Sequence, residues 1–394
     1  MVKHLFKMVW NRKRWNALIF LEIFLSFAVL FVLAVMGLTF VYHARAPIGF
    51  DYKDVWVLHV SYPPNSGGEN WQKTRKTLDA MGNYLDNTSE ITAHGLINTP
   101  PYSNYSWSSS LEVEGRKVRT FFSHTHIGVL EAMDLEIVEG RWLEPNDEIR
   151  EDVIPIVVDS GFARDAYPGE TAAGKRFVDD EETYEILGVV AAFRKNGELR
   201  KHRNFTFRPM GKEVSWAPGF WLLEVPGGKN TALEEKIVND LESMGPGYAF
   251  KIETMVDQRE AYFAKQTQNL KIVSLIAFFM LAMVALGLLG VLWQHVTRRT
   301  VELGVRRAKG ATRKKIYTQI TGELLVVATL ALVLGLVILL QVPVIGMPFQ
   351  LPTPVLVSGF ITAAIAIYLL TTAASLYPGW LATQTPPADA LHYE

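Results

Sequence analysis

Four long apolar runs constrain the fold of this chain more than any other feature. A helix needs about 20 apolar residues to cross a hydrocarbon layer about 30 Å thick. The runs occupy 17–41, 272–293, 321–340 and 355–377, and the third is the shortest. Buried helices of soluble proteins rarely contain such runs. The sequence therefore predicts an α-helical membrane protein with four transmembrane helices.

The first run is interpreted as a retained span. It is too long for the apolar core of a secretory signal, and no small-residue cleavage pattern follows it promptly. The preceding segment 1–16 places Leu5, Phe6, Val9 and Trp10 at helical spacing among basic residues. This pattern predicts an amphipathic helix on the inner face of the membrane.

The orientation follows from the basic residues beside the spans. The N-terminal segment and the connection 297–316 are rich in Lys and Arg, whereas the connection 341–354 carries no charge. Basic connections face the cytoplasm. We therefore expect both termini, including the tail 378–394, to be cytoplasmic, and the loop 341–354 to be external.

The segment 43–268 is then a large extracytoplasmic domain. It holds 35 of the 40 acidic residues but only 25 of the 39 basic ones, a net charge of about -10 that the overall charge of -1 hides. The chain has no cysteine, so this domain has no disulfide and depends on its hydrophobic core. Its length is sufficient for that.

Alternating and helical patterns predict an α/β domain of two lobes. One lobe, nearer the membrane, comprises about 51–99 and 211–256 and is built from two strand–helix–strand units. The second lobe is an insertion at about 100–210. The expected strands are 55–60, 91–97, 111–113, 118–123, 154–158, 184–190, 220–225 and 248–254, and the expected helices are 70–85, 127–133, 161–167, 232–243 and 258–270. The last helix runs directly into the second span.

Two patterns that suggest enzyme or metal chemistry are rejected. The stretch 169–175, GETAAGK, has the spacing of a phosphate-binding loop, but Arg176 follows where magnesium binding needs Ser or Thr, and no strand leads into it. A glycine turn is the better interpretation. His124 and His126 are too few for a metal site. We predict no catalytic residue, no metal or cofactor site and no nucleic-acid partner for this chain.

The connection 297–316 contains RRTVELGVRRAKGA and has two interpretations. It could anchor the chain to anionic lipids, at about 1 kcal/mol per basic residue. Alternatively, it is a short cytoplasmic helix that docks to a soluble protein. Apolar residues such as Val301, Leu303 and Val305 supply a contact surface that lipid anchorage does not require. Composition does not decide between these interpretations.

The same residues resemble the cytoplasmic signature of MacB/FtsX-like ABC transporter permeases, R-T-x-E-I-G-x-R-R-A-x-G-A-T-R. The matching positions are Arg299, Thr300, Glu302, Gly304, Arg306, Arg307, Ala308, Gly310, Ala311, Thr312 and Arg313. Lys309 departs from the usual apolar residue. The C-terminal YPGWLATQTPPADALHYE is similar to the end of the family, with His392 in place of the common Arg. In the extracytoplasmic domain, LEIVEGRWL, PGETAAGKRF and YEILGVVAAFR resemble a MacB-like periplasmic core domain.

The resemblance implies a permease subunit of the bacterial inner membrane with a periplasmic domain. It implies a dimer of two permease chains, identical or different, and separate cytoplasmic ATPase subunits that bind ATP and magnesium. ATP binding and hydrolysis would then move the periplasmic domain, for export or extraction of a substrate. The implied ATPase contacts are Glu302, Gly304, Arg306, Arg307, Gly310 and Ala311. The implied transmission helix contains Asp257, Tyr262 and Gln266, and the external lobes would meet a substrate or periplasmic partner.

Two other functions remain open. The chain could be a signalling subunit that regulates an extracytoplasmic hydrolase without transport. It could also be an anchored external binding module with no ATPase, in which case replacing 298–315 by a neutral linker would not affect its function.

Overall fold

A computed structural model describes residues 13–64, 66, 71–149, 153–210, 219–297, 305–306, 309–341 and 352–384. The chain divides into two compact units, Met1–Tyr42 with Gln268–Glu394, and His43–Thr267. Most of the predicted amphipathic segment 1–16, of the external loop 341–354 and of the tail 378–394 lies outside the described residues.

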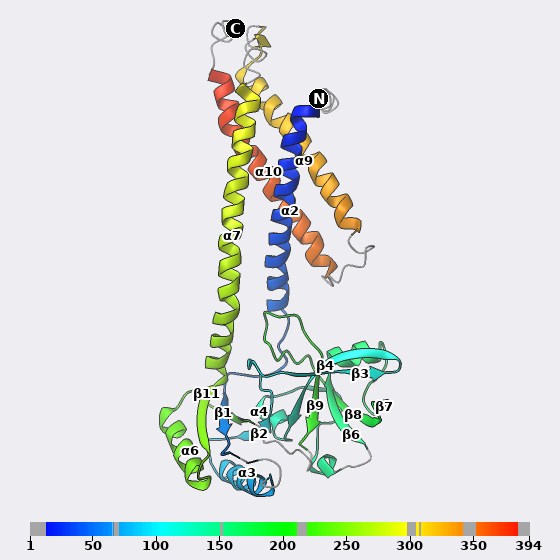
Figure 1. The fold of residues 1–394 in the computed structure, drawn as a ribbon, viewed down its shortest axis with the longest axis vertical. Helices are drawn as coiled ribbons and strands as arrows, with labels where there is room; N and C mark the ends of the chain where they lie inside the picture. The colour runs from blue at the N-terminus through cyan, green and yellow to red at the C-terminus, as the bar shows by residue number, and fades with distance from the viewer. Residues whose placement is uncertain are drawn as a thin grey trace. The chain divides into compact units, whose positions relative to one another are not determined.

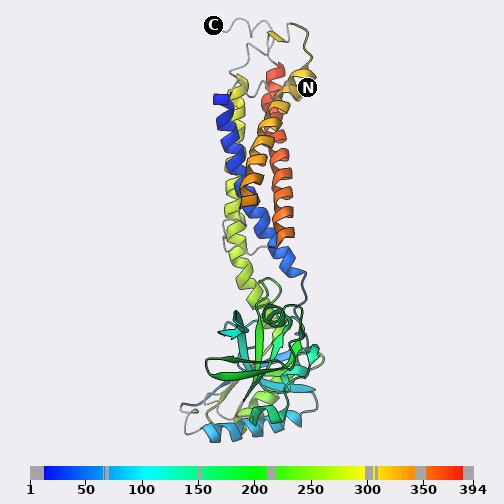
Figure 2. The same cartoon turned by 90° about the vertical axis from the view of Figure 1, so that its right-hand side faces the viewer.

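The first unit contains the four helices that are long and apolar enough to cross a membrane. They are α2 (Lys13–Ala44), the later part of α7 (Met255–Thr297), α9 (Arg313–Gln341) and α10 (Thr353–Gln384). The predicted four-helix membrane fold is confirmed. Figure 2 shows α9 in orange beside α10 in red, and these two helices pack along one another.

Small residues allow α2 to pack closely against its neighbours. A Cβ atom at Gly335 of α9 would lie 2.3 Å from a ring carbon of Phe27, and one at Gly359 of α10 would lie 2.6 Å from Val35. The Phe27 and Phe360 rings also meet edge to face at 5.5 Å. Close approach of this kind is the main source of helix association where lipid replaces water.

The second unit is built on one mixed sheet, whose longest path has the order β11-β1-β10-β2-β4-β9-β6-β8-β5 (Figure 1). Two further strands lie off this path: β3 pairs with β4, and β7 pairs with β8. The strands are β1 Val55–Ser61, β2 Ala93–Ile97, β3 Trp107–Val113, β4 Arg116–Thr125, β5 Ile137–Gly140, β6 Ile154–Asp159, β7 Arg176–Asp179, β8 Glu182–Val190, β9 Phe205–Pro209, β10 Phe220–Glu224 and β11 Ala249–Thr254. The helices are α3 Trp71–Asp86, α4 Val129–Ala132, α5 Ser160–Ala166, α6 Thr231–Met244 and the 3-10 helix η2 Pro145–Ile149.

The two expected strand–helix–strand units associate through their strands. β1 lies between β10 and β11 and pairs antiparallel with both, and β10 also pairs with β2. A single residue pair, Ile97 with Thr125, joins β2 to β4 and so to the strands of the insertion. The predicted mixed α/β domain is confirmed, while the lobe boundaries and the choice of the lobe nearer the membrane stay predictions.

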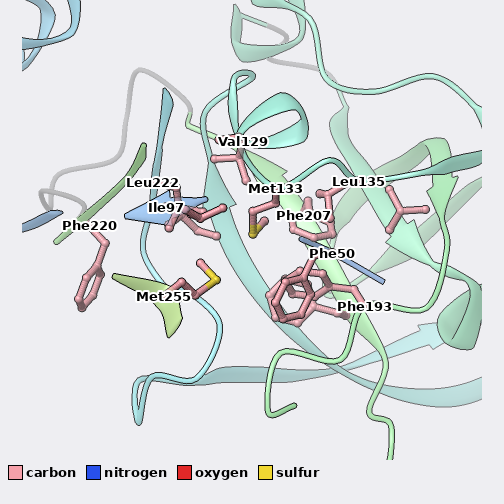
Figure 3. Close-up of a cluster of buried hydrophobic side chains, with 14 of the residues drawn as sticks. Phe50, Ile97, Val129, Met133, Leu135, Phe193, Phe207, Phe220, Leu222 and Met255 are labelled. Carbon is pink, nitrogen blue, oxygen red and sulfur yellow. The ribbon is translucent and has the colours of Figure 1, made fainter. Parts of the chain in front are cut away.

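Alternation along β1 builds a hydrophobic core on each face of the sheet. Trp56, Leu58 and Val60 pack with apolar side chains of α3 and α6. Val55 and Val57 point to the opposite face, where they join a cluster that contains Phe50, Phe193, Phe207 and Met255 (Figure 3). Met255 is the first residue of α7 and is fully buried, so the start of this helix is part of the domain core.

Candidate functional sites: the coupling segment and the start of helix α7

The connection 297–316, which we call the coupling segment, contains a helix end in its described part. Gly310 has φ +89°, a conformation that costs residues with a Cβ about 1–2 kcal/mol. The Ala311 N–H donates to the Arg306 carbonyl at 3.0 Å, and the Lys309 N–H donates to the Val305 carbonyl at 3.0 Å. The second of these is an ordinary helix bond, and the first is the bond that closes a Schellman motif around a left-handed glycine at the end of a helix.

Helix α9 begins immediately afterwards. The Thr312 hydroxyl accepts from the Lys315 N–H at 3.3 Å, and the Thr312 carbonyl accepts from the Ile316 N–H at 3.2 Å. Thr312 therefore acts as the cap of α9. Gly310 and Thr312 together make a sharp turn between the coupling segment and α9.

Arg306 is connected to a buried carboxyl of α9. Its Nη1 donates to the Gln319 Oε1 at 2.7 Å, and the Gln319 Nε2 donates to the Glu323 Oε1 at 2.9 Å. Glu323 is only 8 % exposed. Of the six predicted ATPase contacts, the structure places Arg306, Gly310 and Ala311 at this turn, while Glu302, Gly304 and Arg307 lie outside the described residues.

The three predicted transmission residues lie on the first turns of α7. Thr254 caps the helix, since its hydroxyl accepts from the Asp257 N–H at 3.0 Å. The carboxylate of Asp257 lies in the first turn, where its negative charge interacts favourably with the helix dipole. It also pairs with the Lys229 ammonium at 3.2 Å. Gln266 accepts a hydrogen bond from Arg200 at 2.9 Å.

Side chains from three loops contact Arg259 and Phe263 on these turns, and we call the five residues the α7 clasp: Tyr52, Tyr102, Glu198, Arg259 and Phe263. Arg259 pairs with Glu198 at 2.7 Å and lies over the rings of Tyr52 at 4.8 Å and Phe263 at 4.5 Å. The Tyr102 ring meets that of Phe263 at 6.1 Å. An ion pair between aromatic faces is partly shielded from water, which strengthens it relative to an exposed pair.

Tyr262 lies beside the clasp and lines an open groove. The Tyr102 and Tyr262 rings are 6.1 Å apart, and with Tyr105 and Phe220 they border a groove of about 490 Å³. His59 also lines it, and burial lowers the pKa of its imidazole.

The loop 169–175 is a turn that holds an internal carboxylate. The Ala172 and Ala173 N–H groups donate to the Glu139 Oε2 at 2.9 and 3.4 Å. Lys175 pairs with Glu170 and lies over the Tyr167 ring. The amides and the lysine that would bind phosphate in a nucleotide site are therefore engaged within the chain. Over the described ranges, no group of three or more His, Cys, Asp or Glu side chains could hold a metal ion.

The sequence did not identify Arg259, Glu198 or Tyr102. Each is an ordinary surface residue type, and the residues of the clasp come from segments up to about 200 positions apart. Pairing across such separations depends on the tertiary fold and leaves no local pattern. The one available signal was the helix 258–270 itself, which was predicted to continue into the second span.

Comparison with known proteins identifies a family for the C-terminal part of the chain. The FtsX-like permease C-terminal family matches residues 274–387, which include the coupling segment and the last three spans.

Curated relatives resemble a longer part of the chain. The macrolide export ATP-binding/permease protein MacB of Mannheimia succiniciproducens is 23 % identical over 307 residues, which cover 75 % of this chain and 47 % of the relative. The protein of the same name from Shigella sonnei is 26 % identical over 253 residues, covering 61 % of this chain and 38 % of the relative. The chain thus spans about half the length, or less, of these relatives.

Among solved structures, the periplasmic region of MacB from Actinobacillus actinomycetemcomitans aligns with 55 % of this chain and 96 % of its own length, at 14 % identity and a TM-score of 0.37. The family match and the curated relatives confirm the resemblance to MacB/FtsX-like ABC transporter permeases.

Proposed function

We propose that this protein is the permease subunit of a mechanotransmission ABC transporter. In this proposal, a separate ATPase subunit docks at the coupling segment, and two permease chains, identical or different, form the working unit. ATP binding and hydrolysis in the partner move the extracytoplasmic domain, which exports or extracts a substrate. The chain itself is not an enzyme, and ATP and magnesium bind only to the partner.

The observation that carries the proposal is the continuity of α7. It is a single helix, Met255–Thr297, that starts as part of the domain core and continues as an apolar stretch able to cross a membrane. The α7 clasp fixes its first three turns to the domain through an ion pair and aromatic contacts. In this proposal, the helix transmits a displacement of the apolar stretch to the clasped turns.

The topology follows the same reasoning. We propose that both termini and the coupling segment lie in the cytoplasm of a bacterial cell and that the domain lies in the periplasm, because the basic connections face inward. Gly310 and Thr312 make a sharp turn directly after Arg306, and such a turn beside a cytoplasmic segment would suit docking to a soluble subunit.

The test is to lower the helix propensity of α7 between the α7 clasp and the apolar stretch. T267G/Q268G places two glycines in the helix interior, at a cost of about 1 kcal/mol each, whereas T267A/Q268A preserves helix propensity as the matched control. We expect the glycine variant to keep the ATPase activity of the complex and to lose most of its function in cells, and the alanine variant to keep both. Full function in the glycine variant would refute mechanical transmission through α7.

ATPase docking is tested separately by R306E and R306K. The resemblance implies that Arg306 contacts the ATPase, so we expect R306E to abolish co-purification with the cognate ATPase while membrane insertion stays normal. R306K keeps the charge and should retain at least part of the binding. Undiminished capture of the ATPase by R306E would contradict the assigned contact.

The deletion phenotype distinguishes transport from signalling. Loss of efflux or of lipoprotein release on deletion supports transport. A cell-chaining defect without either loss supports the alternative, in which the subunit regulates an extracytoplasmic hydrolase.

A further inference from the structure

The segment 194–204, RKNGELRKHRN, is strongly basic although the domain that contains it carries a net charge of about -10. Its only acidic residue, Glu198, is paired with Arg259. Arg200, Lys201 and Arg203 are exposed, as is Arg45 just after helix α2. We call Arg45, Arg200, Lys201 and Arg203 the basic collar.

Arg194 links this segment to the residues at the end of α2. Its side chain is buried, with only 4 % of the residue surface exposed. Its Nη1 donates to the carbonyls of His43 at 2.7 Å and Ala46 at 3.2 Å, and its Nη2 donates to those of Glu198 at 3.3 Å and Arg200 at 2.5 Å. The first apolar run ends at position 41, so His43 lies only about 3 Å further along the helix. Lys201 also lies near enough to the His43 imidazole to act on it electrostatically.

A second, separate contact links the segment to α7. Arg200 donates to Gln266 on α7 at 2.9 Å. The apolar run of this helix begins at position 272, six residues later, which is about 9 Å along a helix axis. A headgroup layer is about 5–8 Å thick on each side of the hydrocarbon. Long basic side chains beside both helices therefore lie within reach of lipid headgroups.

From these two connections we propose that the basic collar binds the phosphate headgroups of anionic lipids in the outer-facing leaflet of the membrane. The cations offset the repulsion between an acidic domain and an anionic surface. This contact lies on the opposite side from the predicted ATPase contact and is additional to the proposed function. Each Lys or Arg near an anionic surface is worth about 1 kcal/mol, or about a fivefold change in local lipid enrichment.

The test uses the absence of natural cysteines. A fluorophore is attached to L199C in the full chain, which is reconstituted in nanodiscs of phosphatidylcholine with a minor fraction of phosphatidylglycerol. Either lipid carries a nitroxide quencher near the headgroup. We expect quenching by labelled phosphatidylglycerol to exceed quenching by labelled phosphatidylcholine, and the ratio to fall by up to about fivefold for each of R200Q, K201Q and R203Q.

The matched control is K73Q/R75Q/K76Q, which removes three cations from α3 and should leave the ratio unchanged. Equal quenching by the two lipids in the otherwise wild-type chain, or an equal loss in the control, overturns the proposal. An acidic protein partner would then be the better candidate for the collar. If the otherwise wild-type chain shows no preference between the two lipids but binds inorganic phosphate, and R200Q/K201Q/R203Q does not, the collar binds free phosphate, which also overturns the proposal.

A second measurement needs no label. Mass spectrometry of the detergent-purified chain should show less retained phosphatidylglycerol in R200Q/K201Q/R203Q than in wild type or in the α3 control. Thermal unfolding of each variant confirms that it is folded. Equal retention in all three proteins would contradict the lipid contact.

Discussion

Arg194 gives the most direct test of how the unit His43–Thr267 holds its first residues against the loop that follows β8. We consider its replacement by methionine, which has a similar length and no hydrogen-bonding group. The guanidinium donates four hydrogen bonds to main-chain carbonyls from 43 to 46 and from 198 to 200. Methionine would leave these carbonyls without their donor and would separate the two segments.

The magnitude follows from two opposing contributions. Four hydrogen bonds to a charged group, at about 1.5 kcal/mol each, stabilise the site by roughly 6 kcal/mol. Burying the cation costs several kcal/mol, and methionine recovers that cost. Burial does lower the pKa of Arg194, which is consistent with this cost. We expect R194M to weaken the site by about 3 kcal/mol, which corresponds to roughly a 150-fold change in an opening equilibrium.

Amide hydrogen exchange measured by mass spectrometry on the full chain reports this locally. The Arg194 N–H donates to the Ile48 carbonyl at 2.9 Å, and the Gly197 N–H donates to the Arg194 carbonyl at 2.7 Å. Both amides should exchange about 150-fold faster in R194M. R203M removes an exposed arginine and should change exchange by less than about threefold, or about 0.5 kcal/mol. Equal behaviour of the two variants would refute the assigned role of the buried guanidinium.

Three further predictions concern single residues. Gly310→Ala should weaken the turn before α9 by about 1 kcal/mol because of its positive φ, and Gly310→Asn should restore part of the loss, as hydrogen exchange of the following amides will show. Burial lowers the pKa of Lys195 from 10.5 to about 8, so the unfolded chain binds more protons between these values and the free energy of unfolding rises with pH there. Urea unfolding should therefore show wild type gaining about 2 kcal/mol relative to K195M from pH 7 to 9.5, and a pH-independent difference would contradict the buried charge. Gly335→Leu should destabilise the helix bundle by about 1–3 kcal/mol through its collision with Phe27, whereas Gly290→Leu, at a position with open space around it, should be tolerated, as thermal denaturation in detergent will test.

The sequence predicted the elements that depend on local pattern. The apolar runs predicted all four long helices, and the alternation of apolar and polar residues predicted the central strands β1, β6 and β10. The prediction missed β5, β7 and β9. The first two have only four residues each, too few to show an alternating pattern. β9, FTFRP, follows the basic segment and ends in proline, and its pairing is parallel to β4 and antiparallel to β6, which only the complete sheet determines.

The candidate sites show the same division between local and nonlocal information. Thr312 and Gly310 are recognisable from sequence because capping and left-handed glycine are local properties. Arg194 and Lys195 resemble surface residues, yet both are 4 % exposed. Their burial depends on carbonyls from segments about 90 to 150 residues away, including those of Ser103 and Tyr105, to which the Lys195 ammonium donates. No window of sequence contains both partners.

The length of α7 is the physical argument for mechanical coupling over an anchored binding module. Its 43 residues correspond to about 64 Å of helix, roughly twice the 30 Å that a hydrocarbon layer requires. A simple anchor needs only the apolar stretch, and a loop could join it to the domain. Instead, the additional turns begin with the buried Met255 and carry Arg259 into the α7 clasp, where rotation of the helix would break its ion pair with Glu198 and its cation–π contact with Tyr52. A neutral replacement of 298–315 decides between the two, since an anchored module would keep its function and a motor-driven one would lose it.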